Sequence, residues 1–441
     1  MGKKKETIFQ EQTARIKDLF LDELSQNEVL KKRGIEEDGQ RIRPEGEYNR
    51  DYTRILYASS FRRLQGKMQL YAVQSDQFIR NRLTHSLEVA QIARSIASEI
   101  GYNSEELYVV EAGALAHDLG NPPFGHAGER HLNKLCAKIG GFEGNAQTLR
   151  ILTTVEQKRP DFQGLNLTNR VLLSVVKYFN KFDNTLSIDS QKYSKQKFIY
   201  DDDYELIEAI RENAHINQRT LDVQIVDLAD EIAYAAHDLE DGLRLRVFTV
   251  DELLHDLGRV ANNNDVVQQF EDIICECKEK SAFKNANISS SDFSKLYRKE
   301  LSSKLINTLI QDIGIVKLSE KEKNQRGTKA EQEIGFVTYK SFADGLKKTI
   351  YECTTNSDGV YAYEKKGEEM LTELAQFYNK NVLYLPPEYR AENIIKQYSA
   401  KYSKISGDDK RVLQNRLIID YISGMMDEYV NTTYHRLLKD E

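Results

Sequence analysis

Proline hardly ever interrupts the apolar pattern of this chain. The 441 residues include six prolines, and two of them, Pro122 and Pro123, stand side by side. Long stretches between the prolines carry apolar residues at the spacing of one helix face, and a proline inside such a stretch would break the helix. The sequence therefore predicts an all-α fold in which the paired prolines mark a sharp turn.

The periodicity predicts the helices that carry the polar residues of interest. They span residues 83–100, 105–118, 126–139, 145–157, 168–179 and 218–245. The segment 67–74, KMQLYAVQ, predicts a small β-hairpin arm. The polar stretches 283–291 and 318–334 predict surface loops or insertions.

Composition limits the classes of protein that this chain can belong to. Hydrophobic residues make up 40% and charged residues 30% of it, an ordinary globular balance. No run of about 18 apolar residues predicts a transmembrane helix, and no apolar stretch of a signal peptide opens the chain. Four scattered cysteines do not form a disulfide framework, which favours the cytoplasm. The net charge of -7 implies that an anionic partner would need a local basic cluster.

Three side chains of metal-binding type lie on two neighbouring helices. His85 lies on the helix predicted over 83–100, and His117 and Asp118 end the helix predicted over 105–118. Neutral imidazole and carboxylate are good ligands for Mn, Fe, Zn or Mg. Adjacent residues at a helix tip can both reach one ion. A further ligand would have to come from a distant helix.

Asp230 is the candidate for that further ligand. Its helix carries four carboxylates and a phenol on one face. They are Asp227, Asp230, Tyr234, Asp238 and Asp241. A solvated acidic face is the alternative, although alanines flank the stripe and make the helix apolar nearly all round. The residues alone leave both interpretations open. A His-Asp dipeptide is weak evidence by itself, because His255-Asp256 repeats it on an ordinary amphipathic stretch.

Four motifs in fixed order are more specific than any pair. They are RNRLTHSLEV (80–89), AHDLGNPPFGHAGE (116–129), GFEGNAQTLRIL (141–152) and DLADEIAYAAHDLEDG (227–242). With the stretch 49–71 and the distal DYISGMMDEY (420–429), they resemble the HD-domain deoxynucleoside triphosphate triphosphohydrolases, the dGTPase-like family. The resemblance implies an HD-domain helical fold with a small β-hairpin arm and a helical C-terminal region. It divides the chain into an N-terminal helical extension (1–45), a catalytic core (46–260) and a C-terminal region (261–441) that packs on the core.

The resemblance also implies a reaction and a metal. The expected reaction is hydrolysis of a dNTP, dGTP among the substrates, to the deoxynucleoside and tripolyphosphate. The expected cofactor is one divalent metal per site, such as Mn, Mg or Fe. The residues that match the family's ligand set are His85, His117, Asp118 and Asp230.

His126 and Glu129 match the catalytic histidine of the family and the acid that partners it. Three residues apart on a helix, the two side chains share a face. A carboxylate beside an imidazole orients the ring and raises its pKa, which suits a proton donor near pH 7.

The resemblance implies a set of substrate contacts as well. They are Gln69, Arg82, Lys177, Lys197, Tyr234, Asp238, Glu143 and Asn145. Gln69 and Asp238 match positions that bind the sugar 3′-hydroxyl, and Tyr234 matches a ring that would clash with a ribose 2′-hydroxyl. The two lysines match polyphosphate contacts. Arg54 is either a substrate contact or part of a structural ion pair with Asp51 or Glu47, and the residues leave both open.

Two other functions stay open at this point. Another HD phosphohydrolase, such as a nucleotidase or a cyclic-nucleotide phosphodiesterase, would share the metal ligands. A nucleotide- or single-stranded-DNA-binding regulatory scaffold would need little turnover. Relatives form tetramers or hexamers, so we expect a homo-oligomer. Single-stranded DNA or a regulatory dNTP are further candidate partners, whereas a membrane is not.

Overall fold

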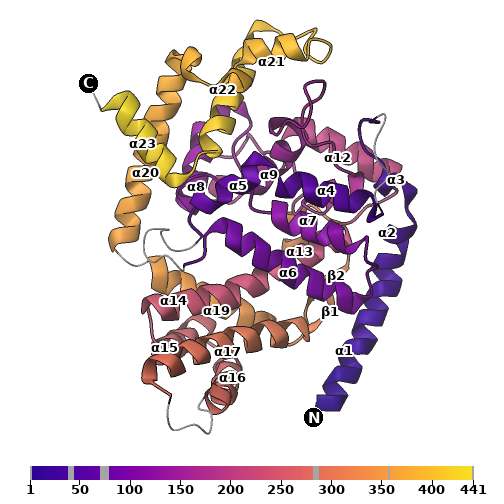
Figure 1. Cartoon of the computed structure of the whole chain (residues 1–441), viewed down its shortest axis with the longest axis vertical. Coiled ribbons are helices and arrows are strands. Elements are labelled where there is room, and N and C mark those ends of the chain that lie inside the picture. The colour runs from indigo at the N-terminus through magenta and orange to yellow at the C-terminus, as the bar shows by residue number, and fades with distance from the viewer. Residues whose placement is uncertain (1, 38–43, 70–78, 282–287, 356–357, 440–441) are drawn as a thin grey trace.

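The computed structural model describes residues 2–37, 44–69, 79–281, 288–355 and 358–439 (Figure 1). Helices dominate these ranges, and their one sheet has two strands. This confirms the all-α fold class. No helix within the described ranges combines the length and the apolarity needed to span a bilayer.

Three helices at the centre of the molecule pack against one another (Figure 1). They are α6 (Arg82–Ile100), α7 (Leu107–Ala116) and α13 (Leu221–Ala233), and α4 (Gly46–Leu56) covers α7. A capping box between Asn81 and Thr84 starts α6, and left-handed Gly101 ends it. Fully buried side chains such as Val89 and Ile225 fill the space between the helices, and each contributes ~1.5–3 kcal/mol.

The helix predicted over 218–245 is observed, with one irregular turn inside it. After α13 the chain passes through a π-helical turn, Tyr234–Asp238, and continues as α14 (Leu239–Leu245). A π-helical turn inserts an extra residue into the helix and is frequent at functional sites. It rotates the polar stripe between Asp230 and Asp238 relative to a regular helix.

The shorter elements of the N-terminal half surround these central helices. They are α1 (Gly2–Ile16), a π-helical turn (Lys17–Leu21), α2 (Asp22–Gln26), α3 (Glu28–Lys31), α5 (Ser59–Arg63), α8 (Gly125–Leu135), α9 (Gly144–Arg150) with a π-helical turn (Ile151–Val155), α10 (Asn169–Leu173), α11 (Gln191–Ser194) and α12 (Asp201–Asn213). Three-residue 3-10 turns occur at 64–66 and 137–139.

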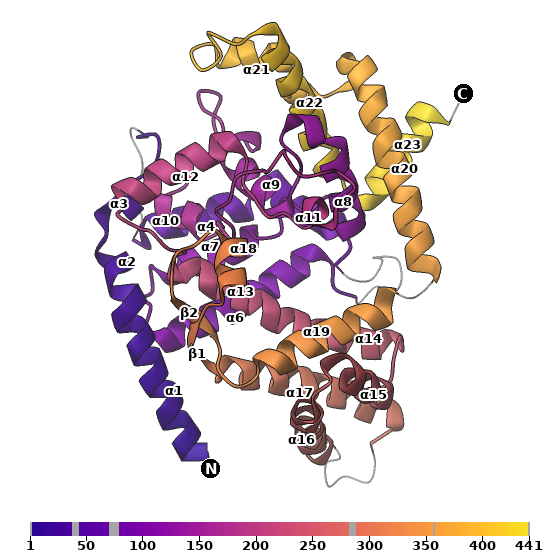
Figure 2. The same cartoon turned by 180° about the vertical axis from the view of Figure 1, so that it is seen from behind.

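For the polar stretch 318–334 the loop alternative is wrong, because most of the stretch is helix or strand. It contains α18 (Glu320–Arg326) and most of β2 (Gln332–Phe336), which pairs antiparallel with β1 (Ile313–Lys317) (Figure 2). The ladder runs from Ile313 opposite Phe336 to Lys317 opposite Gln332. The polar composition was misleading because Glu333 is buried in ion pairs with Arg219 and Arg326.

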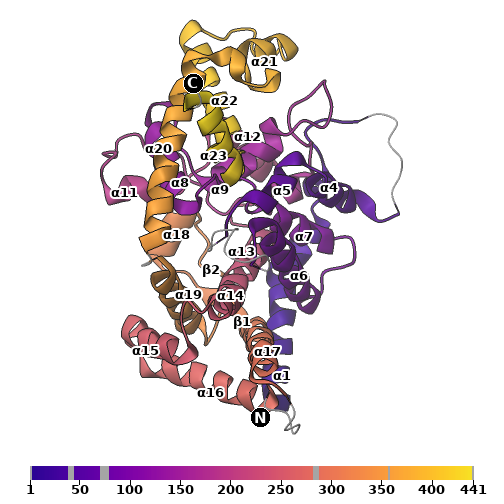
Figure 3. The ribbon, with the colours of Figure 1, turned by 60° about the vertical axis from the view of Figure 1, so that its left-hand side comes forward.

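The C-terminal half forms two groups of helices, below and above the centre in Figure 1. The lower group holds α15 (Val250–Ala261), α16 (Asn264–Ser281), α17 (Ser290–Ile310) and α19 (Lys340–Thr355). The upper group holds α20 (Asp358–Lys380), α21 (Ala391–Gln397), α22 (Gly407–Ser423) and α23 (Asp427–Leu438), with 3-10 turns at 382–384 and 387–389. Helix α20 runs beside α8 (Figure 3), and a second apolar cluster joins them through Phe124, Leu132 and Leu371.

One predicted helix is shorter than expected, and a predicted hairpin and a predicted loop lie largely outside the described residues. The helix predicted over 168–179 stops at Leu173, because the next residues bind the α18 region instead: Phe179 N–H donates to the Arg326 carbonyl (2.9 Å). Most of the hairpin predicted over 67–74 lies outside the described residues, and Met68 forms an antiparallel bridge with Asn81. The loop predicted over 283–291 falls largely outside them too, and α17 begins at Ser290.

Candidate active site

Four predicted ligands from three helices converge at the centre of the molecule. His85 Nε2 lies 3.0 Å from Asp230 Oδ1. His117 Nε2 lies 3.5 Å from both Asp118 Oδ1 and Asp230 Oδ1. Ligand atoms of His85, His117 and Asp118 lie within 4.8 Å of one another, so this His/Asp cluster can hold a metal ion.

The unpaired histidine nitrogens of the cluster are suited to binding a metal ion. His117 Nδ1 lies 2.6 Å from the Ala114 carbonyl oxygen. Donation to that carbonyl places the ring proton on Nδ1 and leaves the Nε2 lone pair for an ion. Among the described residues, His117 Nε2 and His85 Nδ1 are buried without a hydrogen-bond partner. A buried polar atom without a partner is costly, and a bound ion would remove that cost.

The electrostatics of the cluster favour a positive charge. Burial alone would lower the pKa of His117, but Asp118 and Asp230 raise it to about 9. Burial alone would raise the pKa of Asp230, but His117 and His85 hold it well below its usual range. Both carboxyls therefore remain ionised around the point where a cation would bind.

Arg82 and Asn121 hold the Asp118 carboxylate in place. Arg82 Nη1 lies 2.6 Å from Asp118 Oδ2, and the Asn121 amide donates to Asp118 Oδ1. Burial alone would lower the pKa of Arg82, but Asp118 holds it above its usual range, so the guanidinium stays charged. Such outer contacts fix the direction in which a ligand oxygen points.

The turn after the metal pair brings His126 back toward the cluster. The paired prolines separate α7 from α8, and Phe124 adopts a left-handed conformation (φ 62°, ψ 26°) just before α8. For a bulky residue this costs ~1–2 kcal/mol. His126, on the first turn of α8, lies with Nδ1 3.2 Å from Glu129 Oε2, and its side chain is 59% exposed.

Glu129 is fixed by three partners. Its second oxygen accepts from Gly144 N–H (3.0 Å) and lies 3.6 Å from Lys197 Nζ. Burial alone would raise the pKa of Glu129, but His126 and Lys197 hold it well below its usual range. The carboxylate is therefore ionised, and it orients the His126 ring while leaving Nε2 free to face a substrate.

One cavity of 430 Å³ is lined by residues of both the His/Asp cluster and the His126–Glu129 pair. It is of the size expected for a small-molecule site. The predicted site residues that line it are His117, Asp118, Asp230, His126, Glu129, Gln69, Arg82, Asn145, Lys177, Lys197, Tyr234 and Asp238. His85 belongs to the cluster but is not among the residues that line the cavity.

Both predicted lysines carry carboxylate partners. Lys177 Nζ lies 3.1 Å from Asp227 Oδ1, and Lys197 Nζ lies 2.6 Å from Glu143 Oε1. Burial alone would lower the pKa of each lysine, but these carboxylates hold both above the usual range, so both stay charged. Glu143 is not itself among the lining residues. It caps α9 by accepting from Ala146 N–H (2.8 Å).

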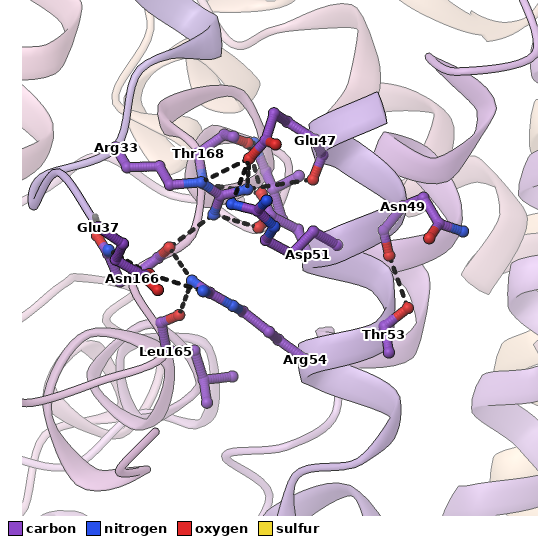
Figure 4. A network of polar contacts seen from close by, with 12 residues as sticks. Arg33, Glu37, Glu47, Asn49, Asp51, Thr53, Arg54, Leu165, Asn166 and Thr168 are labelled. Atoms are coloured by element: carbon purple, nitrogen blue, oxygen red, sulfur yellow. Dashed lines mark hydrogen bonds and ion pairs between the residues drawn. The ribbon is translucent and has the colours of Figure 1, made fainter. Parts of the chain in front are cut away.

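The structure places Arg54 outside the cavity, in a separate polar network (Figure 4). Arg54 Nη2 lies 2.6 Å from Glu37 Oε1, and Nη1 donates to the carbonyls of Leu165 (2.8 Å) and Asn166 (2.7 Å). Its contacts support the structural alternative, with Glu37 as partner in place of Asp51 or Glu47. Those two acids bind Arg33 instead.

The sequence interpretation missed a wall of the cavity that α19 contributes. Asp344, Lys347, Lys348 and Tyr351 line it, and Lys347 Nζ lies 4.7 Å from the Tyr234 ring centroid. The resemblance implies only packing on the core for the C-terminal region (261–441). The spacing of these polar residues, three and four apart, shows that they share one helix face but not that this face meets the cavity.

Comparisons with known proteins agree with this geometry. Residues 82–235 match the HD domain, and residues 338–436 match the phosphohydrolase-associated domain. The chain is 40% identical over 394 residues to deoxyguanosinetriphosphate triphosphohydrolase-like protein 2 of Vibrio cholerae, covering 88% of this chain and 87% of that protein. It is 30% identical to a deoxyguanosinetriphosphate triphosphohydrolase-like protein of Shewanella sediminis, covering 88% and 91%. A relative from a Bradyrhizobium species is 45% identical over 47% of this chain and 49% of its own length.

The matches cover both the helices of the His/Asp cluster and the C-terminal helices that line or adjoin the cavity. The resemblance drawn from the sequence motifs is confirmed. The protein belongs to the HD-domain phosphohydrolases, in the family of the deoxyguanosinetriphosphate triphosphohydrolase-like proteins.

Proposed function

We propose that the protein hydrolyses a dNTP, dGTP among its substrates, to the deoxynucleoside and tripolyphosphate, with one divalent metal. The observation that supports this most is the content of the 430 Å³ cavity. It joins the His/Asp cluster, the His126–Glu129 pair and several lysines. Metal, proton donor and phosphate-binding cations are the three requirements of this chemistry.

In the proposed reaction a water oxygen bonds to the α-phosphorus and releases a proton to solvent, and the bond from that phosphorus to O5′ breaks. All three phosphates leave together, and O5′ takes a proton to become the nucleoside hydroxyl. His126 donates this proton, and Glu129 keeps its ring in place. A divalent ion held by the His/Asp cluster would supply positive charge beside the phosphorus and a polarised water.

The cations of the cavity would bind the polyphosphate. Arg82 faces Asp118 in the cluster, Lys177 and Lys197 lie on the core side, and Lys347 and Lys348 lie on α19. We propose that phosphate oxygens are shared among these groups while each core lysine keeps its carboxylate partner. Preorganised cations of this kind stabilise charge that builds up in the transition state.

Gln69, Asp238 and Tyr234 would bind the sugar. Both polar atoms of the Gln69 side-chain amide are buried and, among the described residues, have no hydrogen-bond partner. A sugar hydroxyl would satisfy them. Burial and the nearby Asp241 raise the pKa of Asp238 well above its usual value, so this carboxyl can donate as well as accept. The Tyr234 ring would exclude a 2′-hydroxyl.

Identification of the products tests the proposal. The purified protein is incubated with Mn and each of the four dNTPs, with GTP as the ribose control, and the products are resolved by ion exchange. Tripolyphosphate with deoxynucleoside is expected, and little product from GTP. Orthophosphate or pyrophosphate would indicate another HD phosphohydrolase. Nucleotide binding without turnover, unchanged in an Asp230→Ala variant, would indicate a regulatory scaffold.

We also propose the three-part division at residues 45 and 260 and a homo-oligomeric assembly. Limited proteolysis tests the first, since cuts are expected near those boundaries. The molar mass from light scattering, measured as the protein elutes from a size-exclusion column, tests the homo-oligomer. A monomer at micromolar concentration would contradict it.

A further inference from the structure

The distal motif DYISGMMDEY has no part in the proposed reaction, yet its polar groups bind the segments that carry the site. Asp420 accepts from Arg150 (2.7 Å) and from the Gln147 amide (2.9 Å) on α9. The carbonyl of Ser423 accepts from Lys67 Nζ (2.8 Å). Helix α9 also supplies the Gly144 N–H that fixes Glu129. The motif therefore supports the cavity from outside.

Asp427 makes the most direct of these contacts. It is buried at the start of α23. One carboxylate oxygen accepts from Met68 N–H (3.1 Å), and the other accepts from Phe124 N–H (3.3 Å). Met68 precedes Gln69, and Phe124 stands two residues before His126. One side chain of the C-terminal region thus holds two segments that each carry a candidate site residue.

Phe124 needs such support because its backbone is left-handed. Its ring packs against α20: a Cβ placed on Gly367 would lie 2.4 Å from the Phe124 ring, and the Tyr363 ring lies 5.3 Å away. The Tyr363 hydroxyl in turn donates to Asp427 (3.4 Å). Residues of α20 and α23 therefore hold Phe124 by both its ring and its N–H. The left-handed turn sets where α8, and with it His126, begins.

We propose that Asp427 is a positioning residue: through the Phe124 N–H it holds the turn that aims His126 at the substrate. This inference rests on the proposed function, because it gives His126 the proton-donating role. It assigns the C-terminal helices a part in the chemistry without any contact between Asp427 and the substrate.

The test compares Asp427→Asn with Glu428→Gln, the same change of group at the neighbouring exposed position. The asparagine keeps one carbonyl oxygen but replaces the other acceptor by NH2, so one backbone N–H loses its partner. We expect kcat to fall by about 10- to 100-fold in Asp427→Asn, since small misplacements of a catalytic group have effects of this size. Bound metal should stay at the wild-type level, and Glu428→Gln should keep wild-type kcat.

A double-mutant cycle separates positioning from general damage. In a His126→Ala background, Asp427→Asn should lower kcat by less than about threefold, because the group that it positions is already absent. The same fold loss in both backgrounds would overturn the inference. If Asp427→Asn does not fold, Gly367→Ala provides the same cycle, because its methyl group displaces the Phe124 ring.

Amide-hydrogen exchange gives a readout that needs no reaction. Peptides that contain Phe124 should exchange faster in Asp427→Asn than in Glu428→Gln, and equal exchange would overturn the inference. The two levels of failure are distinguishable. If His126→Ala alone leaves kcat unchanged, the proposed role of His126 fails and the catalytic part of this inference fails with it. If His126→Ala is inactive and the exchange rates are equal, only the positioning by Asp427 fails.

Discussion

The two sides of the cavity are supported in different ways. The His/Asp cluster stands on α6, α7 and α13, which pack directly on one another in the main apolar core, and the His85 side chain is 1% exposed. His126 is 59% exposed and follows a left-handed turn that packs in the second apolar cluster, against residues from α20 and α23. The His/Asp cluster is thus held within the main core, whereas the His126 side depends on parts of the chain about three hundred residues away.

This difference implies that the proposed metal site and the proposed proton donor, His126, are held in place by different parts of the fold. A change on the His126 side should leave the ion in place, because α8 packs chiefly against α20, whereas α6, α7 and α13 pack on one another. A change in the cluster should remove the ion and with it all activity. Substitutions on each side of the cavity test that separation.

Asp230→Ala should lose metal and activity together. Asp230 Oδ1 contacts both histidines of the cluster, and its removal leaves them without a shared carboxylate. A metal contributes several kcal/mol to charge stabilisation, so activity should fall by more than about 10³-fold. Elemental analysis alongside the product assay checks both parts. Retained stoichiometric metal would remove Asp230 from the ligand set.

The matched control is Asp256→Ala. Asp256 belongs to the His255-Asp256 dipeptide, whose histidine is exposed and whose helix, α15, contributes no residue to the cavity lining. It should keep wild-type metal content and turnover. Loss of metal in this control would mean that the cluster is sensitive to distant damage, which would weaken the contrast between the two sides.

His126→Ala should separate the two sides from the other direction. Loss of a positioned acid lowers turnover by about 10²–10⁴-fold. Bound metal should stay at the wild-type level because His126 makes no contact with the four ligands. His131→Ala, on the same helix but bonded to Thr372 on α20, is the control and should stay active. Unchanged activity in His126→Ala would refute the proton-transfer role, and lost metal would refute the separation.

Lys347→Gln should act on substrate binding rather than on chemistry. Its charge lies over the Tyr234 ring at the α19 wall of the cavity. A hydrogen bond to a charged group contributes ~1.5–3 kcal/mol, so KM should rise by at least about tenfold while kcat stays near wild type. Lys366→Gln, an exposed lysine of α20 outside the cavity lining, is the control. A lowered kcat at unchanged KM would place Lys347 in the transition state instead.

The sequence predicts the four members of the His/Asp cluster through the family resemblance, whereas the residues alone left Asp230 open between a ligand and a solvated acidic face. His85, His117 and Asp230 lie on strongly periodic helices, and the structure brings them together with Asp118 in contact distance. The His126–Glu129 pair came from the family resemblance, and its three-residue spacing explains why the two side chains share a helix face. Both assignments rest on motifs that a single sequence displays.

The parts that escaped prediction depend on contacts between distant segments. Arg54 binds Glu37, and no local pattern shows which acid a buried arginine will choose. Strand β2 has a polar sequence, and it is buried nonetheless because its Glu333 forms an ion pair with Arg219, more than a hundred residues away. The α19 wall carries no motif and reaches the cavity only through tertiary packing. Pairing partners of buried charges are set by the fold as a whole, so they could not be read from spacing.

Asp203→Asn should change stability with pH and leave the chemistry alone. Asp203 is buried on α12 and accepts from Thr153 (2.7 Å) in the turn that follows α9, on the His126 side. Burial raises its pKa to about 6 from 3.8. Between those two values the folded chain binds more protons than the unfolded chain, so the free energy of unfolding falls as pH rises through this window.

Asparagine keeps the accepting oxygen and removes the titration. The variant should therefore be more stable than wild type by ~1 kcal/mol at pH 7.5, less than the full pKa shift would give because water that reaches the site screens the charge. The difference should shrink toward zero as pH falls to about 4, and kcat should not change. Urea unfolding at pH 7.5, 6 and 5 measures it. A constant difference at all three pH values would mean that Asp203 acts by packing and not by charge. A changed kcat would mean that the His126 side responds to stability at α9, so its support would be less specific than the contacts of Asp427 suggest.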